Sequence, residues 1–213
     1  DICFQQEILD AGSEVFRVCS RHRNPLRHYR EWYQLLRGHA GVYDAIVLNT
    51  NSLEYVYPLV IAKKFGIPRR VIHSHNAGFE NAIGTARRTL IAMNQRLLRA
   101  SATDYLACSE AAGRWMFGEK TPFHVVHNAI DTAAYRPDAA RRASVRAALG
   151  VHDALVLGHV GRFSYQKNHD FLLDIFAAVH AKHPDAVLLL VGDAVGDTTF
   201  LDAAHEKAER LGL

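Results

Sequence analysis

The chain has 213 residues, of which 49% are hydrophobic, so it is long enough and apolar enough to form one large or two small globular domains. Its formal net charge of +3 is compatible with anionic ligands but too weak to suggest nucleic acid as a partner, for which we would expect a dense basic stripe. The three cysteines are scattered and odd in number, which argues against a disulfide framework or a zinc motif and favours a reducing cytoplasm.

Along the chain, short apolar runs rich in β-branched residues alternate with longer stretches of helical periodicity. Strands alternating with helices pair in parallel through right-handed crossovers, which predicts open, doubly wound α/β sheets with ligands at the carboxyl ends of the strands. We expect strands over 15–19, 44–49, 69–74, 103–107, 123–127, 155–160 and 187–191. We expect helices over 26–37, 53–64, 85–99, 110–117, 139–149, 168–182 and 198–211.

Two histidines, His73 and His75, stand at the end of the strand predicted over 69–74. An imidazole titrates near neutral pH and can accept a hydroxyl proton or orient a sugar, so both are candidate catalytic residues. Two other interpretations stay open. The histidines can be inert, hydrogen-bonded residues at a strand end, or part of a zinc site, although the sequence supplies no H-E-x-x-H motif or cysteine pair as further ligands.

The helix predicted over 85–99 combines apolar side chains with four arginines. This pattern is typical of a helix that rests on anionic lipid headgroups. It is equally typical of a helix that packs on a core and has a solvated basic edge, which is the interpretation we favour.

The alternating pattern is interrupted between residues 129 and 137. Pro137 has no amide proton and biases Arg136 away from helical geometry, and Asp138 can cap a helix that begins near Ala139. We interpret this segment as a hinge between two α/β domains, 1–134 and 135–213, and crevices between domains are favoured ligand sites.

The most informative segment is 158–170, in which a glycine turn with two cations joins a strand to a helix. Gly161 lets the backbone approach a ligand closely, and the start of the helix offers free amides and the positive end of its dipole. Arg162 can make a bidentate contact with phosphate oxygens, and Lys167 adds a point charge. This pattern predicts a diphosphate site, with two solvated charges on an ordinary loop as the alternative.

A second glycine loop, which begins with Gly192 and Asp193, follows the strand predicted over 187–191, and Thr198 is a candidate cap for the next helix. The sequence contains no P-loop, dinucleotide-binding fingerprint, nucleophile elbow or Asp-x-Asp pair. These absences weaken the case for a P-loop enzyme, a dinucleotide-dependent enzyme or a hydrolase with a catalytic triad.

Several motifs together resemble the family 4 glycosyltransferases, which have the GT-B fold. The motifs are 127–131 with 135–137, then Gly161-Arg162 with Lys167, and then 190–193. The segment 102–118 and the motif 73–76 are similar to the branch that acts in capsule and exopolysaccharide synthesis. The motifs occur in the expected order across nearly the whole chain.

The resemblance implies two Rossmann-like domains, with a saccharide acceptor mainly on 1–134 and a nucleotide-diphosphate sugar on 135–213. It implies transfer of the sugar with retention of anomeric configuration and without a metal ion or other cofactor. Matched residue by residue, it assigns the donor diphosphate to Gly161, Arg162 and Lys167, the donor-side loop to Gly192 and Asp193, the cleft histidine to His75 or else His73, and the hinge to Asn128 and Asp131.

Two features of the family are missing, a glycine loop after the first strand and a pair of glutamates that grips the donor sugar and ribose. We therefore expect an internal fragment that is inactive alone. The resemblance also leads us to expect a lipid-linked acceptor, a cytoplasmic location at the inner face of the membrane with contact through 85–99, and no nucleic-acid partner. The alternatives are a nucleotide-sugar hydrolysing epimerase of related fold and a non-catalytic GT-B scaffold or binding protein.

Overall fold

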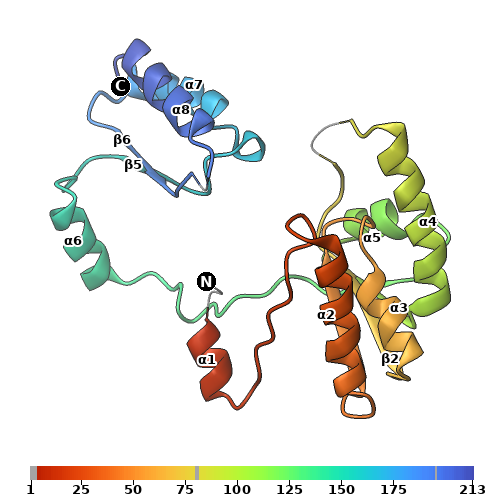
Figure 1. Ribbon diagram of the computed structural model, residues 1–213. Helices are drawn as coiled ribbons and strands as arrows, with labels where there is room; N and C mark the ends of the chain where they lie inside the picture. Colours follow the sequence, from red (N-terminus) through yellow and green to blue (C-terminus); the bar gives the residue numbers. More distant parts are fainter. Residues whose placement is uncertain (1–3, 80–81, 195) are drawn as a thin grey trace. The chain divides into compact units, whose positions relative to one another are not determined.

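The structure is a computed structural model that describes residues 4–79, 82–194 and 196–213. The chain divides into two compact units, Asp1–Ala129 and Ile130–Leu213, which we call the N-terminal unit and the C-terminal unit. In Figure 1 the first runs from red to green and the second from green to blue. The boundary lies at 129/130, whereas the sequence placed it at 134/135.

The N-terminal unit contains a parallel sheet in the order β1-β2-β3-β4. The strands are β1 (Ala45–Thr50), β2 (Arg69–Ser74), β3 (Asp104–Ala107) and β4 (His124–Val125). In the register of β1 and β2, Asn49 lies opposite His73 and Thr50 opposite Ser74. The carboxyl ends of these strands therefore meet at one edge of the sheet, as parallel pairing requires.

The helices of this unit are α1 (Gln5–Asp10), α2 (Pro25–Gly38), α3 (Tyr57–Lys64), α4 (Thr85–Ser101) and α5 (Glu110–Phe117). Local capping explains two of the starts. The Asn24 side chain accepts from the Arg27 amide ahead of a proline at the first helical position, and the Ser109 side chain accepts from the Ala112 amide.

Two expectations for this unit were wrong. Residues 15–19 form no strand, and the Cys19 amide donates to the Glu31 side chain, so it is not available to a sheet ladder. The α3 helix begins at Tyr57 instead of residue 53, because side chains capture the preceding backbone: the Thr50 hydroxyl donates to the Ser52 carbonyl, and the Ser52 hydroxyl accepts from the Glu54 amide. The short helix α1 was not predicted.

The core of the N-terminal unit is nearly solvent-free. Leu59 and Ile72 are 0% exposed and Leu98 is 1% exposed, so α3, β2 and α4 pack closely around them. A second cluster joins α2 to α3 through Leu36, Ile61, Ala62 and Ile67. This packing fixes β2, and with it the histidines at its end.

The C-terminal unit contains a parallel pair of strands, β5 (Val156–Val160) and β6 (Val187–Val191). Its helical segments are α6 (Ala139–Ala148), the 3₁₀ turn η1 (Tyr165–Lys167), α7 (His169–His180) and α8 (Thr199–Arg210). Its core is small and centres on Phe163, Leu173 and Ala204. Both units are parallel α/β, which confirms the predicted fold class.

The sequence predicted two helix caps in the C-terminal unit, of which one is confirmed and the other was wrong. The Asp138 side chain accepts from the Arg141 amide at the start of α6, as predicted. Thr198 makes no side-chain cap on α8. The Asp197 carboxylate instead accepts from both the amide and the hydroxyl of Thr199, because it sits one residue earlier in the turn. Among the described residues, no helix is both long enough and apolar enough to cross a membrane.

Candidate functional site

The two glycine loops of the C-terminal unit lie side by side beyond the ends of β5 and β6. The Gly161 amide donates to the Val191 carbonyl at 2.9 Å, and the Phe163 amide donates to the Asp193 carbonyl at 3.1 Å. A Cβ atom at Gly192 would overlap the carbonyl oxygen of Gly161, so glycine is required for this close approach. The structure thus brings the predicted donor-side loop against the predicted diphosphate loop.

The two cations of this loop carry uncompensated charge. Arg162 and Lys167 are exposed. In the described part of the chain, neither has a carboxylate within 4.0 Å. The aliphatic stem of Lys167 lies 3.2 Å from the place where a Cβ at Gly161 would stand, so its side chain runs across the glycine. The loop can therefore attract an anion through these two side chains.

The start of α7 adds amide donors next to Lys167. Asn168 has φ 47° and ψ 51°, a left-handed conformation that asparagine tolerates, and its side chain accepts from the Phe171 amide at 3.4 Å. The first bond to a helix carbonyl runs from the Leu172 amide to Asn168, so the amides of His169 and Asp170 precede the intrahelical ladder. The sequence predicted this helix start one residue early and did not predict η1.

Two imidazoles lie beneath the loop, and the sequence interpretation did not single them out. His169 is 4% exposed, stacks on Phe163 with 4.2 Å between ring centroids, and meets His159 edge to face at 5.0 Å. Neither ring nitrogen of His169 has a hydrogen-bond partner among the described residues. Burial, then His159 and Lys167, lower the pKa of His169. The available signal was that the two histidines flank the glycine turn.

A buried lysine in α8 is another feature that sequence reasoning missed. Lys207 is 7% exposed and its Nζ lies 2.8 Å from carboxylate oxygens of both Asp170 and Asp174 on α7. These two hydrogen bonds raise the pKa of Lys207. In the sequence, Lys207 looks like an ordinary solvated charge of a helix, and its burial depends on how α8 packs on α7.

In the N-terminal unit, His75 lies at the carboxyl edge of the sheet, where its amide donates to the Thr50 carbonyl. Its Nε2 lies 2.9 Å from Oδ1 of Asn49, at the end of β1. Because Oδ1 is an acceptor, this contact places the proton on Nε2 and leaves the lone pair on Nδ1 of the neutral ring. Such a ring can accept a proton from a bound hydroxyl. Asn49 was not predicted from the sequence.

His73 has different surroundings from His75, although their ring centroids are 4.1 Å apart. The Nε2 atom of His73 is buried without a partner among the described residues. Burial and the neighbouring His75 lower the pKa of His73, against an opposing effect of the Val126 backbone. These effects favour the neutral form of His73, whose buried Nε2 is not accessible to a ligand.

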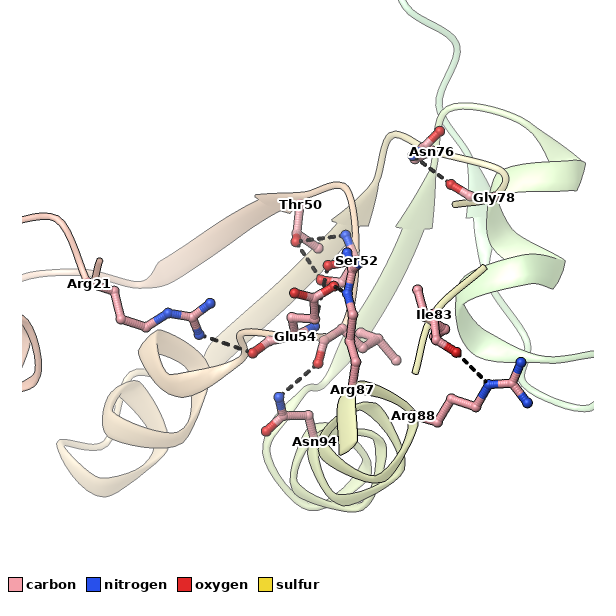
Figure 2. A network of polar contacts seen from close by, with 11 residues as sticks. Arg21, Thr50, Ser52, Glu54, Asn76, Gly78, Ile83, Arg87, Arg88 and Asn94 are labelled. Atoms are coloured by element: carbon pink, nitrogen blue, oxygen red, sulfur yellow. Dashed lines mark hydrogen bonds and ion pairs between the residues drawn. The ribbon is translucent and has the colours of Figure 1, made fainter. Parts of the chain in front are cut away.

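Polar contacts hold the loop between β1 and α3 against α4 and the segment before α2 (Figure 2). The Glu54 carboxylate pairs with Arg87 at 2.5 Å, and the Glu54 carbonyl accepts from Arg21 at 3.2 Å. The buried Asn94 side chain donates to the Leu53 carbonyl at 2.8 Å. The loop that follows Asn49 and Thr50 is thus anchored on two sides.

A groove of about 830 Å³ opens beside this loop. Its walls combine aromatic and aliphatic side chains with Arg21 and His22. Arg21 lies over the ring of Tyr55 at 5.1 Å, and burial raises the pKa of Tyr55, so this phenol stays neutral. The principal apolar and aromatic residues of the groove are Pro25, Tyr29, Tyr55, Tyr57, Leu90 and Leu97.

The predicted hinge residues lie in the exposed segment that follows β4. The Asp131 carboxylate accepts from the Ala133 amide at 2.9 Å, and its carbonyl accepts from the Ala134 amide, which forms a tight turn. Asn128 is exposed. Within residues 4–79, 82–194 and 196–213, no group of three or more His, Cys, Asp or Glu side chains could hold a metal ion, so His73 and His75 belong to no such group.

No model of a known protein family matches the chain. The chain is 33% identical over 196 residues to EpsF of Bacillus subtilis (strain 168), whose name gives glycosyltransferase as its inferred activity. The match covers 89% of the chain and 50% of EpsF, so the chain spans about half the length of this curated relative.

Among solved structures, the chain is similar to Anabaena Alr3699/HepE in complex with UDP-glucose, with 24% identity and a TM-score of 0.73. It is also similar to a glycosyltransferase from Rickettsia africae ESF-5, with 14% identity and a TM-score of 0.71. Both matches cover the whole of the chain, whereas they cover 57% of the HepE structure and 56% of the Rickettsia structure. They confirm the predicted GT-B fold class and, at these identities, establish the fold alone.

Proposed function

We propose that the chain is part of a glycosyltransferase that moves a sugar from a nucleotide-diphosphate donor to a saccharide acceptor. The observation that carries this proposal is the close approach of the Gly161 and Gly192 loops, next to the amides at the start of α7 and to two cations that pair with no carboxylate among the described residues. The likeness to a protein named as a glycosyltransferase and to a structure that holds UDP-glucose supports it.

The C-terminal unit binds the donor diphosphate. Arg162 supplies paired donors that fit phosphate oxygens, Lys167 supplies a point charge, and the amides at the start of α7 add the positive end of the helix dipole. Charge on the diphosphate grows as the bond to the sugar breaks, so these groups stabilise the transition state more than the ground state. Gly192 and Asp193 line the same site, and we propose uridine as the base because of the UDP-glucose complex of HepE.

The N-terminal unit binds the saccharide acceptor. His75, oriented by Asn49, uses its Nδ1 lone pair to accept the acceptor's hydroxyl proton or to orient the sugar. We propose that transfer proceeds with retention and without a metal ion, as the family resemblance implies. Asn128 and Asp131 act in the connection between the units, and the turn at Asp131 supports that structural role.

We further propose a lipid-linked acceptor in exopolysaccharide synthesis at the cytoplasmic face of a membrane. The helix α4 supports this with an exposed apolar stripe, Leu90, Met93 and Leu97, beside Arg87, Arg88 and Arg96. Apolar side chains next to arginines suit the boundary between acyl chains and anionic headgroups. The name of the curated relative, EpsF, supports the exopolysaccharide assignment.

The experiment is a calorimetric titration, with UDP, GDP and ADP, of the glycosyltransferase of which we propose the chain is a part. We expect saturable binding of UDP, weakened by about 1.5–3 kcal/mol in Arg162→Ala, because a charged hydrogen bond to phosphate is lost. Lys167→Ala should act similarly, and the two losses should not add, because both residues contact one ligand. Arg142→Ala, which removes an exposed charge from α6, is the matched control and should bind like wild type. Unchanged affinity in both loop variants contradicts the donor site.

A second measurement concerns turnover in the longer protein. His75→Ala should bind UDP with wild-type affinity and slow the formation of glycosylated acceptor, because the base or orienting group is lost. Free sugar as the sole product would favour the hydrolysing epimerase. Folded protein that binds no nucleotide would favour the non-catalytic scaffold.

A further inference from the structure

The contact between α7 and α8 contains an unusual group for a packed helix pair. Lys207 Nζ lies 2.9 Å from the Asp170 carbonyl, 2.8 Å from an Asp170 carboxylate oxygen and 2.8 Å from an Asp174 carboxylate oxygen. The contacts with the Asp170 carbonyl and the Asp174 carboxylate are hydrogen bonds, and the contact with the Asp170 carboxylate is an ion pair. The residue is buried, with 7% of its surface exposed. Lys207 is therefore held by both aspartates.

Helix stability does not require this arrangement. Replacing a buried ion pair with apolar groups is often neutral or stabilising, because burying the charges costs about as much as their attraction returns. The carboxylates of Asp170 and Asp174 are largely exposed, at 75% and 51%, so water could solvate them without Lys207. The pair therefore calls for an explanation other than packing.

The position of Asp170 supplies such an explanation. It is the acidic residue in the first turn of α7, three residues after Lys167 and two after Asn168. Together with Ser164, Tyr165, Asn168 and His169, it lines a cavity of about 180 Å³ between the loop and α8. A free carboxylate at this place would repel an anion bound at the loop and would compete with it for Lys167.

We propose that Lys207 is a positioning residue of the nucleotide-diphosphate site, which offsets the charge of Asp170 so that Lys167 and the free amides of α7 serve the diphosphate. This inference rests on the proposed function, since it concerns the same site. Lys207 Nζ donates to the backbone carbonyl of Asp170 and pairs with its carboxylate, so the positive charge is held at that turn.

The test compares UDP affinity at low and high salt in variants of the glycosyltransferase of which we propose the chain is a part. Lys207→Met should bind UDP about three- to tenfold more weakly at low salt, because an uncompensated carboxylate then lies in the first turn of α7, next to the proposed site of an anionic ligand. The loss should shrink at high salt, where charges are screened. Lys207→Met combined with Asp170→Asn should recover near-wild-type affinity, since the repelling charge is gone. Lys182→Met, which removes a lysine beyond the other end of α7, controls for net charge and should bind normally.

Two further variants separate charge from folding. Lys207→Gln keeps hydrogen-bond donors without charge and should lose affinity as Lys207→Met does, which keeps the test valid if the methionine variant fails to fold. Asp170→Asn alone should bind UDP at least as tightly as wild type. A loss that persists at high salt and in the double variant overturns the inference, because it marks a packing role. Equal binding by wild type and Lys207→Met overturns this inference alone, whereas no UDP binding by wild type overturns the proposed function with it.

Discussion

The two units place polar groups at the carboxyl ends of parallel strands by different means. In the N-terminal unit the groups are side chains, His75 and Asn49, and they stand on a core whose central residues are 0–1% exposed. In the C-terminal unit the backbone itself forms the site, where the Gly161 loop touches Gly192, and the strands beneath end in exposed residues, Val160 and Val191. Side chains fixed by a core suit directional proton transfer, whereas exposed cations next to the amides at the start of α7 suit an anion. The difference matches the division of labour that we propose.

The largest expected effect is in the core of the N-terminal unit. Leu59→Ala should lower the free energy of unfolding of this unit by about 2–5 kcal/mol, because the 0%-exposed side chain leaves a cavity. Both tryptophans, Trp32 and Trp115, lie in the N-terminal unit, so their fluorescence follows its unfolding in denaturant. Leu90→Ala, at 41% exposure, is the control and should cost within about 0.5 kcal/mol. Equal losses of unfolding free energy in Leu59→Ala and Leu90→Ala would show that this core does not stabilise the N-terminal unit as we describe.

The next largest effect on stability is expected at the backbone contact between Gly161 and Gly192 in the C-terminal unit. Gly192→Ala should cost about 1–3 kcal/mol, because the new methyl group overlaps the Gly161 carbonyl and forces the loops apart. Amide exchange in β5 and β6 would measure this loss. Gly158→Ala in β5 is the matched control: its Cβ would meet nothing within 4 Å, so it should be neutral or slightly stabilising. If the amides of β5 and β6 exchange at the same rate in both variants, the close approach does not hold the Gly161 and Gly192 loops together.

A smaller effect is expected at a helix cap of the N-terminal unit. Ser109→Ala should cost about 1 kcal/mol, because the Ala112 amide loses its acceptor at 3.2 Å. Tryptophan fluorescence is again the readout. Ser109→Asp, which keeps an acceptor oxygen, should retain most of the stability, and an equal loss in both variants would argue against the cap.

The smallest effect is a pH dependence in the C-terminal unit. The pKa of His169 is lowered from its ordinary 6.5, so below about pH 6.5 the unfolded chain binds more protons at this residue than the folded chain does. The free energy of unfolding should therefore fall as the pH falls through this range. His169→Phe, which keeps an aromatic ring on Phe163, should flatten the decline measured by exchange of α7 amides. An unchanged decline would show that His169 does not cause it.

The sequence was sufficient for the parts of this molecule that depend on local pattern. Alternating strands and helices, the cap at Asp138 and the order of the glycine loops follow from residues close in the chain. What it could not supply depends on contacts between distant residues. Asn49 meets His75 only because β1 and β2 pair in one register, and Lys207 meets Asp170 only because α8 packs on α7.

The wrong expectations have similar causes. Residues 15–19 have the composition of a strand, but their backbone finds a side-chain acceptor in α2 instead of a neighbouring strand. The start of α3 moved because short polar side chains captured the backbone ahead of it, a competition that apolar periodicity does not report. The roles of the site residues remain predictions that the experiments above address.

The most direct test of the central claim is amide hydrogen exchange, with and without UDP, across this chain within the glycosyltransferase of which we propose it is a part. We predict slower exchange at residues 161–169 and 192–194 of the C-terminal unit, no change at the edge formed by Asn49 and His75, and loss of the protection in Arg162→Ala. Protection that appears at the N-terminal edge instead, or that survives in Arg162→Ala, would contradict the assignment of the diphosphate to the glycine loops.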